Sequence, residues 1–203
     1  MTGKIIDDTL SQNVGRGVSM DIAQIFAKAK KTVLTTGGYD PTLSIETIDR
    51  EYPPMFIPNP CLTWNDRTTE QKQKLLFFLG RDFARREYET ADTIRKIILV
   101  TETWFVTDVK EENCHIAAGD HPEKREGINA LELRVEEGKK LKQRMYMAEI
   151  IRHGDLIDIA PFGTIDEVQS SLLLVFLAGI SSGIWNDVEF EQVVKRFKEV
   201  GEI

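Results

Sequence analysis

The sequence contains few of the residues on which secreted scaffolds and membrane proteins depend. Only two cysteines occur among 203 residues, which excludes a disulfide-dense secreted scaffold. The longest apolar run covers residues 172–180, whereas a membrane-spanning helix needs about 20 apolar residues. Residues 1–10 carry two aspartates and lack the apolar stretch of a signal peptide. We therefore expect a cytoplasmic protein that has no membrane partner.

The short motifs of common catalytic and cofactor sites are also absent. The sequence has no phosphate-binding loop, no glycine-rich dinucleotide motif, no paired-histidine zinc motif and no serine nucleophile elbow. Its formal net charge of -7 disfavours nucleic acid as a general partner, because phosphate binding requires a basic surface. No cofactor is expected, and the missing motifs leave open whether the protein is an enzyme.

What is present is the composition of one globular domain. Hydrophobic residues make up 41% of the chain and charged residues 29%, and a chain of this length buries a core without disulfides. We expect a single domain over 1–203, with a loose arm at 1–17. The pattern Thr164-x-x-Glu167 matches a helix capping box, and residues 161–203 hold seven acids against three bases. An acidic pair of helices is therefore expected at 164–200.

The hydrophobic periodicity predicts an α+β fold. Residues 97–106 alternate with apolar side chains on both faces, which is typical of a central strand. Residues 128–160 alternate in three segments separated by turns, which predicts an antiparallel meander beside that strand. Thr68 and Gln71 form a capping-box pattern before a helical stripe that ends near Glu87. We expect a mainly antiparallel sheet with helices packed on one face.

A carboxylate interrupts the predicted central strand. Glu102 shares one strand face with Trp104, two residues later, and burying a carboxylate is costly unless it is paired. Arg125 and Arg152 are its expected partners if the meander packs beside this strand. Two interpretations remain open. Glu102 belongs either to a buried network that fixes strand register, or to a pocket in which it acts as acid, base or ligand anchor.

The densest polar segment lies at residues 114–126, between two predicted strands. It contains four side chains of metal-ligating type, Cys114, His115, Asp120 and His121, but their spacing matches no closed site, so no metal is expected. A small hydrolase, metal-dependent or not, is the alternative function that this segment suggests. Its candidate site residues are Glu102, Asp120, His121, Arg125 and Glu126.

Two further groups are candidates for binding a partner. The aromatic residues of the proline-rich segment 52–64 either form a partner surface or cover one end of the core. The lysines at the tip of the predicted hairpin either contact nucleic acid or are simply solvated. With two residues near Glu102, the binding candidates are Trp104, Arg152, Tyr52, Phe56, Trp64, Lys139, Lys140 and Lys142.

The order of these features resembles a known group of proteins. The apolar strand closes with Thr101-Glu102-Thr103-Trp104, a polar loop with His121-Pro122 and Arg125-Glu126 follows, and the meander carries Arg152 near its last turn. Over residues 40–160 the chain resembles a loosely defined set of uncharacterised small α+β proteins of prokaryotes and their phages. No activity is attached to that set, so the resemblance implies only a bacterial or phage accessory protein.

The sequence as a whole favours a non-catalytic interaction protein. We expect an intracellular subunit or adaptor of a larger assembly, whose partner is another protein or a second copy of the chain. Two alternatives remain open. One is the hydrolase described above, and the other is an accessory protein that contacts nucleic acid through Lys139, Lys140 and Lys142.

Overall fold

The computed structural model describes residues 21–57, 64–107, 116, 118–136 and 140–183, with positions 190, 192, 195 and 199. Within these residues the chain forms three α-helices, one short 3-10 helix and six strands. In chain order they are α1 (Ile22–Thr36), β1 (Thr42–Thr47), β2 (Met55–Phe56), α2 (Thr69–Glu87), η1 (Ala91–Thr93), β3 (Ile94–Phe105), β4 (Arg125–Val135), β5 (Leu141–His153), β6 (Leu156–Asp166) and α3 (Ser171–Gly183).

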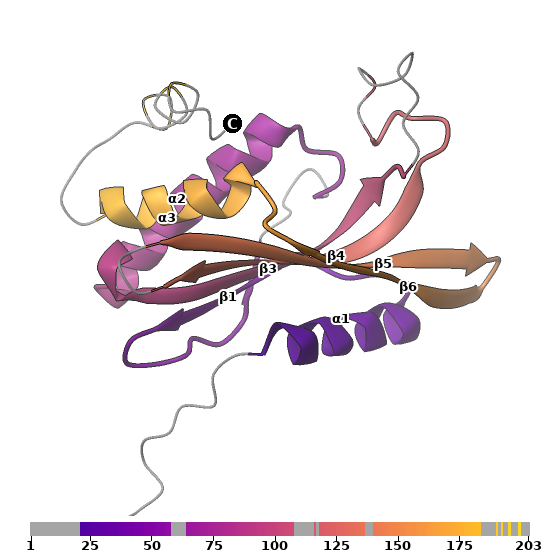
Figure 1. The fold of residues 1–203 in the computed structure, drawn as a ribbon, viewed down its shortest axis with the longest axis horizontal. Helices are drawn as coiled ribbons and strands as arrows, with labels where there is room; N and C mark the ends of the chain where they lie inside the picture. The colour runs from indigo at the N-terminus through magenta and orange to yellow at the C-terminus, as the bar shows by residue number, and fades with distance from the viewer. Residues whose placement is uncertain are drawn as a thin grey trace, which may run out of the picture.

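The described strands form one sheet in the order β2-β1-β3-β4-β5-β6 (Figure 1). Every neighbouring pair is antiparallel. The α+β fold with a mainly antiparallel sheet is thus confirmed, and the predicted meander is the β4–β5–β6 unit beside β3. The described residues of the proline-rich segment contribute β2, which has two residues and lies at the edge of the sheet, where a strand with few ladder bonds is tolerated.

Helices cover both faces of the sheet, so the expectation that they pack on one face is wrong. Ile97 and Leu99 of β3 belong to the core cluster that contains α2 and α3, whereas Ile98 and Val100 pack with α1. Figure 1 shows α1 on one side of the sheet and the α2–α3 pair on the other. The reason is the period of two along β3. Because its side chains alternate between faces and are apolar on both, each face requires a cover.

Local signals define the ends of α1 and α2. The Asp21 carboxylate caps α1 by accepting the N–H of Ala23 at 2.9 Å, and Gly37 ends the helix in the left-handed conformation (φ 84°). In α2 the predicted capping box is confirmed. The Thr68 hydroxyl accepts the N–H of Gln71 at 3.2 Å, and the Gln71 side chain accepts the N–H of Thr68 at 2.8 Å.

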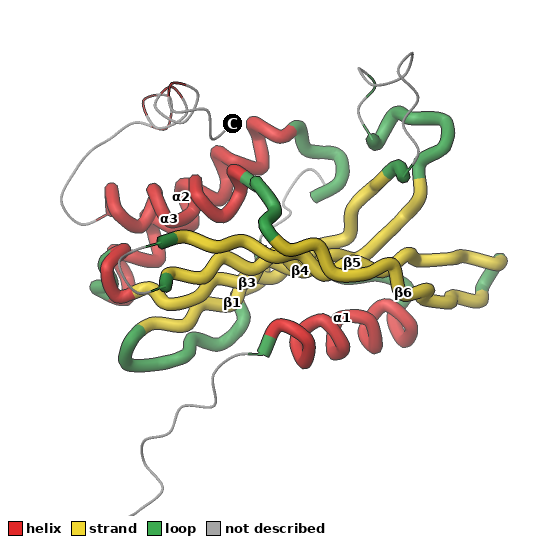
Figure 2. Tube along the Cα trace, viewed as in Figure 1, coloured by secondary structure: helices red, strands yellow, loops and turns green. Residues whose placement is uncertain are grey.

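The carboxyl-terminal part begins differently from the prediction. Thr164 lies in β6, which runs to Asp166, so the pattern Thr164-x-x-Glu167 caps no helix. Thr164 instead pairs with Tyr146 of β5. Its backbone is extended in the sheet, so a helix cannot begin there. The first helix of the expected pair is α3, and it begins at Ser171 (Figure 2). Most of the second helix, and the arm at 1–17, lie outside the described residues.

Two glycines set the distance between α2 and α3. A Cβ atom on Gly80 would overlap the carbonyl oxygen of Phe176, and a Cβ on Gly179 would overlap the carbonyl oxygen of Phe77. The two helix backbones therefore touch at this point. This close approach lets the pair present a shared apolar surface to the sheet, built from Leu76, Phe83, Ala84, Leu173, Phe176 and Ile180.

We predict that Gly80→Ala destabilises the protein, although alanine is the better helix former by about 1 kcal/mol. The added methyl group meets backbone rather than a movable side chain, so the loss should be at least about 1–3 kcal/mol. Urea unfolding measures it. Ser181→Ala, at an exposed position of α3, is the matched control and should change stability by less than about 0.5 kcal/mol. A stabilised Gly80→Ala variant would contradict the backbone contact.

Candidate functional site

The loop between α1 and β1 is held against the sheet by Glu102. This residue follows Ile98 and Val100 at intervals of two along β3, so its side chain shares their face, which α1 covers. Its carboxylate accepts the backbone N–H of Tyr39 at 2.7 Å. A Cβ atom on Gly38 would lie 3.5 Å from the same oxygen, so the loop backbone passes directly over the carboxylate.

Arg152 of β5 makes a second attachment to this loop. Its guanidinium binds both carboxylate oxygens of Glu126, each at 2.6 Å, and donates a further hydrogen bond to the carbonyl of Gly37 at 2.9 Å. Glu126 is opposite Trp104 in the β3–β4 register, next to Glu102 on the same face. Arg152 and Glu102 therefore fix the backbone on either side of Gly38, at the end of α1.

A pocket of about 560 Å³ opens beside Glu102. Its described lining residues include two carboxylates and no Lys, Arg or His, and the buried Trp64 is one of them. The eight lining residues are Thr36, Gly38, Tyr39, Asp40, Pro41, Trp64, Asn65 and Glu102. The ammonium of Lys72 stands 5.4 Å from the centre of the Trp64 ring, outside the lining. The pocket itself is therefore acidic and rich in hydrogen-bond acceptors.

The electrostatic environment of Glu102 disfavours its charged form. Burial raises the pKa of this carboxyl group above its ordinary value, and the negative charges of Glu126 and Asp40 act in the same direction. The hydrogen bond from Tyr39 and the charge of Arg152 oppose the rise without cancelling it. The neutral form of Glu102 is therefore favoured to a higher pH than in an exposed glutamate.

The structure does not bring the residues of the hydrolase alternative together. Arg125 alternates with Glu126 on β4 and therefore faces away from Glu102, and it pairs with Glu149 at 3.4 Å. The expectation that Arg125 neutralises Glu102 is thus wrong, because strand alternation places the two on opposite faces. Arg152 is on the same face as Glu102, but its hydrogen bonds go to Glu126 and Gly37.

The remaining residues of the polar segment do not line the pocket either. The His121 side chain is 2% exposed, and its Nδ1 accepts the N–H of Glu123 at 3.1 Å. Trp104 packs near Gly119, and the ammonium of Lys124 lies 4.8 Å from its ring centre. Cys114 and His115 lie outside the described residues. Among the residues that are described, no three His, Cys, Asp or Glu side chains are grouped as metal ligands would be.

The aromatic candidates divide into core and surface residues. Tyr52 and Trp64 are buried in the cluster that α2 and α3 cover, so they close one end of the core. The Tyr52 hydroxyl donates to Glu89 at 2.6 Å, and burial raises the pKa of Tyr52 to about 12. Phe56 is 72% exposed on the edge strand β2 and is the one of the three that a partner can reach directly.

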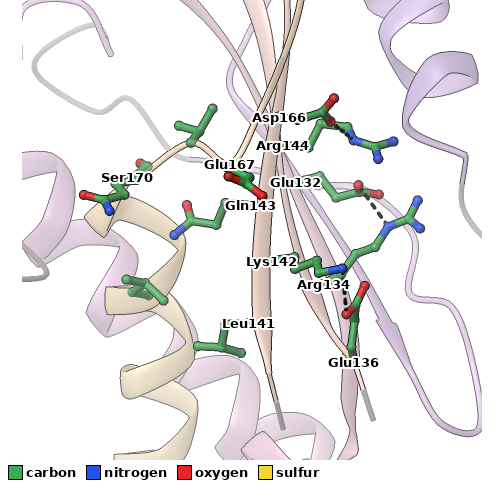
Figure 3. A pocket seen from close by; sticks show the side chains of 13 residues that line it. Glu132, Arg134, Glu136, Leu141, Lys142, Gln143, Arg144, Asp166, Glu167 and Ser170 are labelled. Atoms are coloured by element: carbon green, nitrogen blue, oxygen red, sulfur yellow. Dashed lines mark ion pairs between the residues drawn. The ribbon is translucent and has the colours of Figure 1, made fainter. Parts of the chain in front are cut away.

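A second pocket, of about 580 Å³, lies at the other end of the meander (Figure 3). Acids and bases alternate across three strands there and form ion pairs of 2.8–3.0 Å. The pairs are Arg134–Glu132, Lys142–Glu136 and Arg144–Asp166. Lys142 of the predicted basic tip is thus neutralised, Lys140 is exposed, and Lys139 lies outside the described residues. Sequence reasoning missed this site, although folding the hairpin on paper puts Glu132 opposite Arg144.

No helix in the described part of the chain combines the length and apolar character needed to cross a membrane. Comparison with protein families, with curated proteins and with solved structures found no match. The geometry of the two pockets therefore carries the functional argument.

The raised pKa of Glu102 predicts a pH-dependent cost of folding. The folded chain holds the Glu102 proton more tightly than the unfolded chain, whose carboxyl group titrates near 4.5. The free energy of unfolding therefore falls as the pH rises from about 4.5 through the raised pKa, and this contribution is constant above it. Glu102→Gln lacks this loss, so its stability relative to the wild type should increase over the same pH window. Urea unfolding at closely spaced pH values measures the difference, and parallel profiles would contradict the assignment.

Proposed function

We propose that this is a non-catalytic interaction protein, a subunit or adaptor that holds a basic side chain of a partner protein in the Glu102 pocket. The supporting observation is the composition of that pocket. Glu102 and Asp40 line it together with Trp64, and none of its described lining residues is a lysine, arginine or histidine. Carboxylates with an aromatic wall are the surroundings that guanidinium and ammonium groups prefer.

The energetics of Glu102 support a cationic ligand. Burial and the neighbouring acids Glu126 and Asp40 raise the pKa of Glu102, so its ionised form is under-compensated in the free protein. A guanidinium group in the pocket supplies the missing positive charge and donates to acceptors at Glu102, Asp40 and Asn65. Such a charge-assisted hydrogen bond contributes more than a neutral one.

The same residues give less support to catalysis. Acid–base chemistry needs a second group within reach of the substrate atom that Glu102 would serve. Asp120, His121 and Arg125 are absent from the pocket lining, and Arg125 is engaged with Glu149 on the other face. A protein surface that anchors a partner requires only the pocket.

Nucleic acid is a less suitable partner than a basic protein. Lys142 and Arg144 are each bonded to an acid, at 3.0 Å to Glu136 and 2.8 Å to Asp166. Phosphate contacts would have to displace these acids as well as overcome the formal net charge of -7. The charge balance therefore favours a basic protein segment.

A peptide titration tests the proposal. The probe is a pentapeptide with arginine at its centre and glycine and serine on both sides, and binding is followed by NMR on the full chain. We expect a dissociation constant on the order of 1 mM, which corresponds to one anchored side chain. Replacing the arginine by its neutral isostere citrulline, or Glu102 by glutamine, should weaken binding about tenfold. Added salt should weaken it as well.

Glu149→Gln is the matched control, because Glu149 is also a half-buried acid of the sheet but faces away from the pocket. It should leave the affinity unchanged. Equal affinities for the arginine and citrulline peptides, or an equal loss in the two protein variants, would contradict the proposal.

A further inference from the structure

None of the described strands lies on the outer side of the last residues at one end of β5. The β5–β6 pairing ends at Arg144 opposite Asp166, whereas β5 extends to Leu141. The Gln143 carbonyl accepts the N–H of Val168 at 3.3 Å, so this carbonyl points to the outer edge. Backbone groups of a strand alternate between its two edges. Leu141 therefore directs its N–H and carbonyl outward as well, where no described strand pairs with them.

The second pocket wraps around this open edge. Figure 3 shows Glu132 and Arg144 on one side of β5 and Gln143 and Leu141 on the other, toward α3. Because β6 ends before β5 does, the space beside the last residues of β5 is open to both faces of the sheet. Its volume of about 580 Å³ is sufficient for several residues of an extended chain.

Two buried oxygen atoms in the pocket lining have no hydrogen-bond donor among the described residues. They are Oε1 of Glu132, whose side chain is 2% exposed, and Oε1 of Gln143. Leaving a buried acceptor unpaired costs stability. Because the two atoms lie on opposite faces of the sheet, a single small group cannot satisfy both. An extended strand beside β5 can, because its successive side chains alternate between the faces.

The charges of the pocket indicate what one of those side chains must be. The lining contains four acids, Glu132, Glu136, Asp166 and Glu167, against three bases. Each base is already bonded to an acid, and Nε of Arg134 and Nε of Arg144 lie 2.9 and 2.8 Å from their carboxylates. Both arginine side chains are over 40% exposed and can turn aside. The unmet demand on this face is for a donor with a positive charge.

We propose that the outer edge of β5 at Leu141–Gln143 binds an extended segment of a partner protein that carries a lysine or arginine. The segment continues the sheet where β6 has ended. Its backbone bonds Leu141, beyond the point where Val168 already bonds the Gln143 carbonyl, and its basic side chain donates to Glu132. The side chain of the next partner residue points to the opposite face, where it lies against Leu141 and Leu174 and near the Gln143 amide. This edge is separate from the Glu102 pocket, and the proposal does not rest on the function assigned to that pocket.

The test uses an acetylated and amidated pentapeptide in which valine and lysine alternate. Its binding to the full chain is followed by amide NMR shifts. We expect the largest shifts at Leu141, Gln143 and Val168. The same peptide with N-methyl groups on alternate amides cannot form the ladder, and it should bind at least tenfold more weakly. This comparison leaves the protein unchanged and so does not depend on the folding of a variant.

Protein variants then separate the two pockets. Glu132→Gln should weaken the lysine peptide about tenfold and leave a glutamine-containing peptide unaffected, whereas Glu102→Gln should change neither. Equal binding of the methylated and unmethylated peptides would overturn the proposal, as would shifts confined to the Glu102 pocket. A dimer that forms with rising concentration and shifts the Leu141 and Gln143 amides without peptide would also overturn it, because a second copy would then occupy the edge.

Discussion

The burial of β3 on both faces is the constraint on which the rest of the structure depends. Ile97 and Leu99 face one way and Ile98 and Val100 the other, and all four are at most 1% exposed. Each such side chain contributes about 1.5–3 kcal/mol when it leaves water. Helices must therefore cover both sides of the sheet, and the chain supplies α1 to one face and the α2–α3 pair to the other.

The polar site follows from where this apolar cover stops. Beyond Val100 the burial of β3 decreases, and Glu102 occupies the position at which α1 ends. Arg152 and Glu102 bind the loop at Gly37 and Tyr39 there. Partly exposed ion pairs contribute only about 0–1 kcal/mol. The network therefore positions the loop, while the apolar layers determine the fold.

Much of the fold could be predicted because its signals are local. The period of two in β3, the capping box at Thr68 and the turns of the meander each depend on a few neighbouring residues. The side on which a helix packs depends on residues far apart in the sequence, so α1 could be misplaced although the two apolar faces of β3 were visible. The strand position of Thr164 was hidden for the same reason, because a capping-box pattern is short and the β5–β6 ladder is not local.

The candidate site was predictable to a similar degree. Glu102 stands out because an acid in an apolar strand needs an explanation. Arg152, expected as its partner, lies on the same face but bonds Glu126 and Gly37. Asp40 and Asn65 gave no signal, since they reach the pocket through loops whose path depends on tertiary contacts. Arg125 was misassigned because a shift of one residue along a strand moves a side chain to the opposite face.

The central claim is that the Glu102 pocket lacks a positive charge that a partner supplies. The most direct measurement is the pKa of Glu102, read from its side-chain carboxyl resonance in an NMR titration, without and with a saturating concentration of the arginine pentapeptide. Because binding and protonation are linked, a cation beside the carboxylate must lower this pKa. The account predicts a lower pKa in the complex. A pKa that is unchanged or higher on binding would contradict it.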